Sequence, residues 1–217
     1  MSLEEEKRAL SGLLDQMPQV GLDALGGNGS PLFSLDFVIA GAVKRTLSLG
    51  YGLQSMVESK NLICSRAIVR MQIDTVSRIL GYTYVEDPQK VAKNVIGGRP
   101  LNKHKSRENK RLTDGYLIER MTHQYPWVRK VYQSTSGDIH FSEKQFFASV
   151  SSMDDEGKGR RIKLEISQFD HKYPESSWIE VVACFYHVTS ILKEIFERYG
   201  RDKAANNTLQ PTLRKRG

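Results

Sequence analysis

This chain of 217 residues contains very little cysteine, with Cys64 and Cys184 as its two thiols. Both lie inside apolar helical patterns, so a disulfide framework is not expected and a reducing compartment is the natural setting. No apolar run reaches the roughly 18 to 20 residues that a membrane span requires. The acidic start MSLEEEKRAL lacks the basic and apolar regions of a secretory signal peptide. We therefore expect a cytoplasmic protein with no membrane segment.

Several enzyme motifs are also missing from the sequence. There is no G-x-S-x-G nucleophile elbow and no Walker phosphate loop. Asp138, His140 and Glu143 have side chains of the types that bind metals, but no second ligand cluster accompanies them at a recognised spacing. The sequence therefore predicts neither a metal nor another cofactor.

The charged residues of the chain are predominantly basic. Lys and Arg outnumber Asp and Glu by 32 to 25, which gives a net charge of +7 and favours anionic partners such as nucleic acid. Apolar residues make up 39% and charged residues 26% of the chain, which is a globular mixture. The length fits one domain with tails.

Apolar periodicity predicts a mainly α fold, an up-and-down helical bundle with one inserted β-hairpin. Gly81 should close the third helix, and Thr113 or Asp114 should cap the fifth. The expected helices cover residues 3–17, 36–59, 61–81, 87–96, 114–125, 127–136 and 176–200. The expected units are an N-terminal helix with a Gly-rich linker over 1–35, a bundle domain over 36–202 with the hairpin at about 147–167, and a disordered basic tail over 203–217.

Four charged residues, Arg66, Arg70, Asp74 and Arg78, recur every four positions in the predicted helix 61–81. This spacing places them along one stripe of the helix. One interpretation is an anion site lined by Arg66 and Arg70. The other is an ion-pair ladder in which Asp74 neutralises Arg70 and Arg78.

The stretch SGDIHFSEKQFF places His140 after an expected turn and before a short helix that begins at Ser142. A histidine near neutral pKa beside an arginine stripe is suited to metal-independent phosphodiester cleavage, because His transfers a proton while Arg stabilises charge on phosphorus. His140, Arg66 and Arg70 are therefore the candidate catalytic residues, with Asp74 secondary. The alternative is a half-buried structural histidine.

The segment GGRPLNKHKSRENKRLTD, residues 97–114, is rich in basic side chains and is expected to form an exposed loop. Its basic residues would bind the phosphates of RNA or DNA without sequence preference, or would simply be solvated. Nearby aromatic residues could stack bases or belong to the core. The candidate nucleic-acid-binding residues are Arg99, Lys103, Lys105, Arg107, Lys110 and Arg111, and the aromatic residues are Tyr116, Tyr125, Trp127 and Tyr132.

The arginine-bearing helix followed later by a histidine segment resembles the HEPN superfamily of helical ribonucleases from bacterial defence and toxin systems. The family signature is an Arg followed by a His after four to six residues, which Arg99 and His104 match. Pro100 and the loop surroundings depart from the helical setting of that signature. The resemblance implies a homodimer, RNA as substrate and a partner such as an antitoxin, and it makes Arg99 and His104 secondary catalytic candidates.

Two functions follow from these patterns. The first is a HEPN-like protein that cleaves RNA without metal or binds RNA. The alternative is a non-catalytic protein-interaction or regulatory protein that uses the basic loop as its contact surface.

Overall fold

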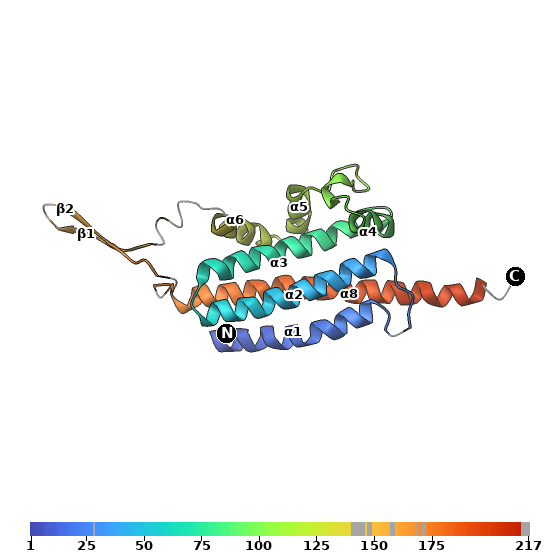
Figure 1. Ribbon diagram of the computed structural model, residues 1–217, viewed down its shortest axis with the longest axis horizontal. Coiled ribbons are helices and arrows are strands. Elements are labelled where there is room, and N and C mark those ends of the chain that lie inside the picture. The colour runs from blue at the N-terminus through green and yellow to red at the C-terminus, as the bar shows by residue number, and fades with distance from the viewer. Residues whose placement is uncertain are drawn as a thin grey trace.

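The computed structural model describes residues 1–27, 29–139, 146, 149–156, 159–167, 169–170 and 172–213. Four long helices lie side by side along the molecule (Figure 1), α1 Leu3–Ala24, α2 Ser34–Glu58, α3 Leu62–Thr83 and α8 Glu175–Leu213. The first three alternate in direction, and α8 runs the same way as α1. Shorter helices cover the α3 side, namely α4 Pro88–Ile96, the 3-10 helix η1 Leu101–Lys103, α5 Asp114–Gln124 and α6 Trp127–Ile139. The predicted helical bundle is confirmed.

Side-chain caps at the helix starts explain why several helices begin where they do. Ser2 and Glu5 form a capping box on α1, and Asn61 caps α3 through the backbone N–H of Cys64. Asp87 accepts from the Lys90 backbone N–H at the start of α4, directly before a proline at the first helical position. The predicted cap at Thr113 is confirmed by its bond from the Tyr116 N–H.

Several predicted helix ends are wrong. The first helix continues past 17 to Ala24, through Pro18, because buried Val20 and Ala24 extend its apolar face into the core. The third helix continues past Gly81, where a β-carbon would lie 3.0 Å from Leu117 of α5, so this glycine allows close helix packing instead of ending the helix. The helix expected over 127–136 continues to Ile139.

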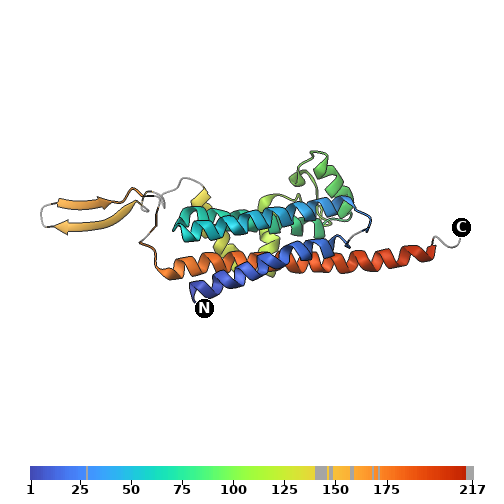
Figure 2. The same ribbon diagram turned by 60° about the horizontal axis from the view of Figure 1, so that its bottom comes forward.

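The final helix also runs further than predicted, reaching Leu213 instead of ending near residue 200. Its extension past the bundle is visible at the C-terminal end of the molecule (Figures 1 and 2). Lys203 at the start of this extension is 6% exposed. Residues 203–213, expected as a disordered tail, are thus helical, and Lys203 is packed against the bundle.

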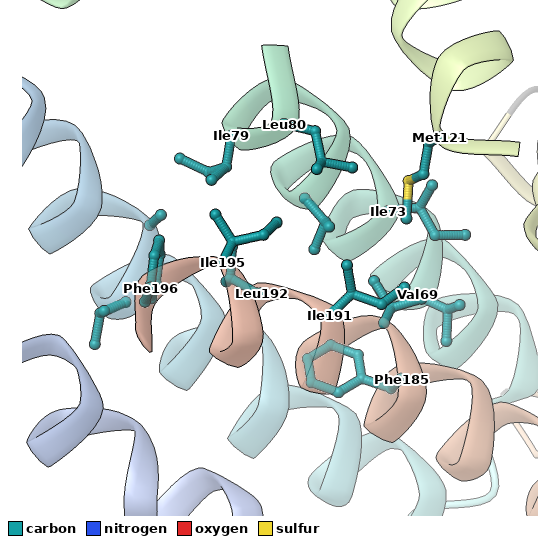
Figure 3. Packing of buried hydrophobic residues seen from close by; sticks show 14 of the residues in the cluster. Val69, Ile73, Ile79, Leu80, Met121, Phe185, Ile191, Leu192, Ile195 and Phe196 are labelled. Atoms are coloured by element: carbon teal, nitrogen blue, oxygen red, sulfur yellow. The ribbon is translucent and has the colours of Figure 1, made fainter. Parts of the chain in front are cut away.

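The core lies between the long helices and is made of aliphatic and aromatic side chains. Figure 3 shows its centre, where Val69 and Ile73 of α3 face Phe185 and Ile191 of α8, with Met121 of α5 closing one side. Phe185, Ile73 and Met121 have no exposed surface. At roughly 1.5 to 3 kcal/mol for each fully buried large apolar side chain, this cluster supplies most of the drive to fold.

A two-stranded antiparallel hairpin projects from the end of the bundle opposite the C-terminus (Figures 1 and 2), as β1 Val150–Glu156 and β2 Gly159–Leu164. The predicted hairpin is confirmed. Met153 pairs with Ile162, and both side chains are more than half exposed. Within the described residues, no helix has the length and apolar composition needed to cross a membrane.

Candidate nucleic-acid interface

The basic segment between α4 and α5 is a folded loop that is tied to the bundle. Leu101 and Leu112 are 5% and 1% exposed and anchor the two ends of the loop in the core. Between them, Lys105 and Arg111 form an isolated antiparallel bridge, and the Arg107 N–H donates to the Tyr84 carbonyl at 2.9 Å. The loop backbone is therefore held in one conformation on the ends of α3 and α5.

The six candidate basic side chains of this loop all face solvent. Arg107 Nη1 donates to the Thr83 carbonyl at 3.0 Å, and Lys105 Nζ donates to Asn109 Oδ1 at 2.7 Å, so both cations are positioned by neutral groups. Across the part of the chain that the structure describes, none of the six forms an ion pair. We call the surface formed by Arg99, Lys103, Lys105, Arg107, Lys110 and Arg111 the basic loop surface.

The acidic residue of the loop, Glu108, does not neutralise these six cations. Its carboxylate pairs with Arg120 of α5 at 3.1 Å and accepts from the Tyr116 hydroxyl at 3.4 Å. The basic loop surface therefore keeps a net positive charge, which attracts polyanions over about one Debye length, roughly 8 Å at physiological salt.

A groove of about 600 Å³ opens beside the start of the loop, between α2, α3 and α4. Pro100 and Leu101 form its loop side, and the charged residues of its lining are Arg45, Arg78 and Asp74, two cations and one carboxylate. Arg45 Nε donates to Thr75 Oγ1 at 3.0 Å, which orients the guanidinium and leaves its terminal nitrogens for another acceptor. Arg45 was not among the candidates from sequence, because a lone Lys-Arg pair in an amphipathic helix carries no distinguishing signal.

The third arginine of the predicted stripe, Arg78, pairs with Asp114 of α5 at 2.6 Å, and both side chains are about half exposed. Such a pair contributes little to stability, about 0 to 1 kcal/mol, because water screens it. The pair instead joins the groove to the helix that follows the basic loop.

The HEPN-like pair, Arg99 and His104, is divided between surface and interior. Arg99 is exposed, while His104 is 8% exposed and its Nε2 is buried without a hydrogen-bond partner. Burial, followed by the positive charge of Arg99, lowers the pKa of His104 below its usual value. At pH 7 the imidazole is therefore neutral and shielded from a polyanion on the loop surface.

Arg70, in the predicted arginine stripe, is already bound by neighbouring side chains of the protein. Arg70 Nη1 pairs with Asp74 Oδ1 at 2.5 Å, and its guanidinium lies 3.5 Å from the ring centroid of Tyr132 in α6. The side chain is 11% exposed. Arg70 is thus enclosed between α3 and α6, with its charge balanced by Asp74 and by the tyrosine ring.

Arg66 lies one turn earlier, in a small cavity of about 110 Å³ between α3, α6 and α8. Glu180 and Cys184 line the same cavity, and Arg66 stacks 5.6 Å above the Tyr173 ring. Burial, helped by the charge of Glu180, raises the pKa of the Cys184 thiol to about 12. His140 and residues 141–145, where the short helix was expected to begin at Ser142, lie outside the described residues.

Of the four candidate aromatic residues that follow the loop, three pack against the core and one is partly exposed. Three of them, Tyr116, Tyr125 and Tyr132, pack against the hydrophobic core. Trp127 is 38% exposed and packs edge-on against His187. No cluster of potential metal ligands occurs among the described residues, and the Asp138, His140 and Glu143 side chains lie outside them.

Comparisons with protein-family models, with curated protein sequences and with solved structures found no match to this chain.

Proposed function

We propose that this protein binds single-stranded RNA, with the basic loop surface and the Arg45 and Arg78 groove holding the phosphate backbone. One observation carries the proposal: six exposed cations without carboxylate partners sit on a loop whose backbone is fixed by the bundle. Because the loop is already ordered, binding pays little conformational entropy.

Binding without cleavage is the activity that the described side chains favour. Arg70 is enclosed by Asp74 and Tyr132, so it cannot move to a phosphate without breaking a partly buried ion pair. His104 is neutral and buried, which removes it as a proton donor to bound RNA. The HEPN resemblance supplies the substrate class, RNA, and would place such binding in a bacterial defence or toxin system.

The test is the salt dependence of binding to a labelled oligonucleotide of single-stranded RNA. Each phosphate contact made by a Lys or Arg contributes about 0.7 to the slope of log affinity against log salt. Replacing Lys103, Lys105 and Arg107 together by Gln should weaken binding strongly at low salt and reduce this slope by about 2. A change of affinity with an unchanged slope would contradict phosphate binding by the loop.

A matched control keeps the change of net charge the same. Arg8, Lys130 and Arg201 are exposed on α1, α6 and α8, so their triple Gln variant also lowers the charge by three. We expect it to bind RNA almost as the unchanged protein does. Equal loss in the two triple variants would show that net charge alone, and not the basic loop surface, attracts the RNA.

Cleavage is tested in the same samples by incubation in chelator and by product mapping. The binding proposal expects intact RNA. Metal-independent cleavage that disappears in His140→Ala would contradict the proposal of binding without cleavage, and it would identify His140 as the residue that transfers the proton.

A further inference from the structure

A second site lies in a cavity of about 550 Å³ near the end of the bundle from which the α8 extension leaves. Its volume falls in the range of small-molecule pockets, roughly 300 to 1,000 Å³. Ile79 and Leu80 of α3 form one wall and Ile195 of α8 faces them, as Figure 3 shows. The first turns of α2 and α4 close the remaining sides through Leu35, Ile39, Pro88 and Gln89.

Four polar side chains behind the cavity wall, Asp36, Gln89, Tyr199 and Lys203, are satisfied by one another, whereas the Tyr84 hydroxyl in the lining is buried without a hydrogen-bond partner among the described residues. Tyr199 donates its hydroxyl to Asp36 Oδ1 at 2.8 Å, and Lys203 Nζ pairs with Asp36 Oδ2 at 2.7 Å. Gln89 accepts from the Leu35 N–H and donates to the Tyr199 hydroxyl. Burial raises the pKa of Tyr199, so its hydroxyl stays protonated. This network stiffens the wall, and its two buried charges, Asp36 and Lys203, neutralise each other.

The rim of the cavity, in contrast, carries an available cation. Arg198 is exposed, and among the described residues it makes no ion pair or hydrogen bond. The exposed amide of Gln124 lies at the same rim and can supply a further donor. Asp202, one turn further along α8, also lines the rim. An apolar interior beneath a guanidinium and an amide is complementary to an amphipathic anion.

We propose that this cavity binds a small amphipathic carboxylate, with its aliphatic body between α3 and α8 and its carboxylate on Arg198. The apolar walls gain about 25 cal/mol for each Å² of ligand surface removed from water, and Arg198 selects the charge of the head group. This site is separate from the basic loop surface and does not depend on the proposed RNA binding.

Isothermal titration with dodecanoate, dodecanol and dodecyltrimethylammonium, each below its micelle concentration, tests the proposal on the full chain. Dodecanoate should bind most tightly, and Arg198→Gln should weaken it by about tenfold or more while leaving dodecanol binding unchanged. Arg201→Gln, with the same charge change on the same helix outside this cavity, should have no effect. No dodecanoate binding in the millimolar range, or equal binding by Arg198→Gln, would overturn the site, and a preference for the ammonium probe would overturn the assignment to Arg198.

A cavity-filling variant separates the pocket from surface adsorption. Ile195→Phe adds volume inside the apolar wall and should weaken dodecanoate and dodecanol alike. If thermal melting shows that this variant unfolds, Ile39→Phe fills the cavity from the α2 side and replaces it. Unchanged binding by a folded filling variant would show that the probes adsorb elsewhere and would overturn the proposal.

Discussion

The contact that fixes the end of the bundle is the buried pair between Lys203 of α8 and Asp36 of α2. Lys203 Nζ donates to Asp36 Oδ2 and to the Leu25 carbonyl, both at 2.7 Å, and the two charged side chains are 4% and 1% exposed. Lys203→Met keeps an unbranched side chain one atom shorter than lysine and removes its charge. The substitution leaves the Asp36 carboxylate buried without its cation.

Breaking a buried pair by removing one partner costs about 3 to 5 kcal/mol. Asp36 would keep two donors, the Phe33 N–H at 2.6 Å and the Tyr199 hydroxyl at 2.8 Å. We therefore expect the lower end of the range, a loss of about 3 kcal/mol in the free energy of unfolding. With a slope of about 2 kcal/mol per M of urea, the midpoint of urea unfolding should fall by about 1.5 M.

The double variant Asp36→Asn, Lys203→Met is the internal control, because the neutral amide needs no cation: its oxygen can accept from the Phe33 N–H, and its NH2 can donate to the Tyr199 hydroxyl oxygen. It should recover most of the lost stability. Arg201→Met removes an exposed cation from the same helix and should stay within about 0.5 kcal/mol of the unchanged protein. A loss of less than about 1 kcal/mol in Lys203→Met would refute the reasoning, because it would mean that residue 203 is solvated rather than packed against α2.

Three further predictions concern packing, thiol reactivity and pH. Gly50→Ala should destabilise the protein by about 1 to 3 kcal/mol in urea unfolding, because its β-carbon would overlap a buried leucine of α1. Gly12→Ala, with open space around it, should stabilise the protein by up to about 1 kcal/mol. Equal effects of the two substitutions would contradict the contact between α1 and α2. Native protein should react with one equivalent of a disulfide reagent at pH 8, through exposed Cys64. It should react with two equivalents only after unfolding, because burial raises the pKa of the Cys184 thiol to about 12. Rapid reaction of both thiols in the native protein would contradict the burial of Cys184. Stability should fall as pH decreases below about 6.5, because the unfolded chain protonates His104 more readily than the folded chain does, and His104→Gln should flatten this dependence; an identical pH profile would show that His104 is solvated.

The sequence predicted those parts of the fold that depend on local chemistry. Apolar periodicity located the long helices, and the side-chain cap at Thr113 identified the start of α5. Helix ends were predicted less well, because they depend on contacts with distant residues. Gly81 continues a helix because it packs against α5, and Lys203 continues one because Asp36 binds it from another helix.

The candidate site was likewise predicted where it depends on local sequence and missed where it depends on contacts between distant segments. Six basic residues clustered in sequence were found from the pattern alone, and they remain exposed in the fold. The burial of His104 and the enclosure of Arg70 by Tyr132 arise from segments that meet only in the folded chain. Arg45 is a further case, because α2 brings it beside the loop while dozens of residues separate the two in sequence.

The central claim is that the basic loop surface binds RNA phosphates. The most direct measurement is the affinity for a single-stranded RNA oligonucleotide as salt is varied, made on the unchanged protein and on the Lys103, Lys105 and Arg107 triple Gln variant. The account predicts salt-sensitive binding whose log–log slope drops by about 2 in that variant, roughly 0.7 for each lost contact. The same slope and affinity in both proteins would contradict it.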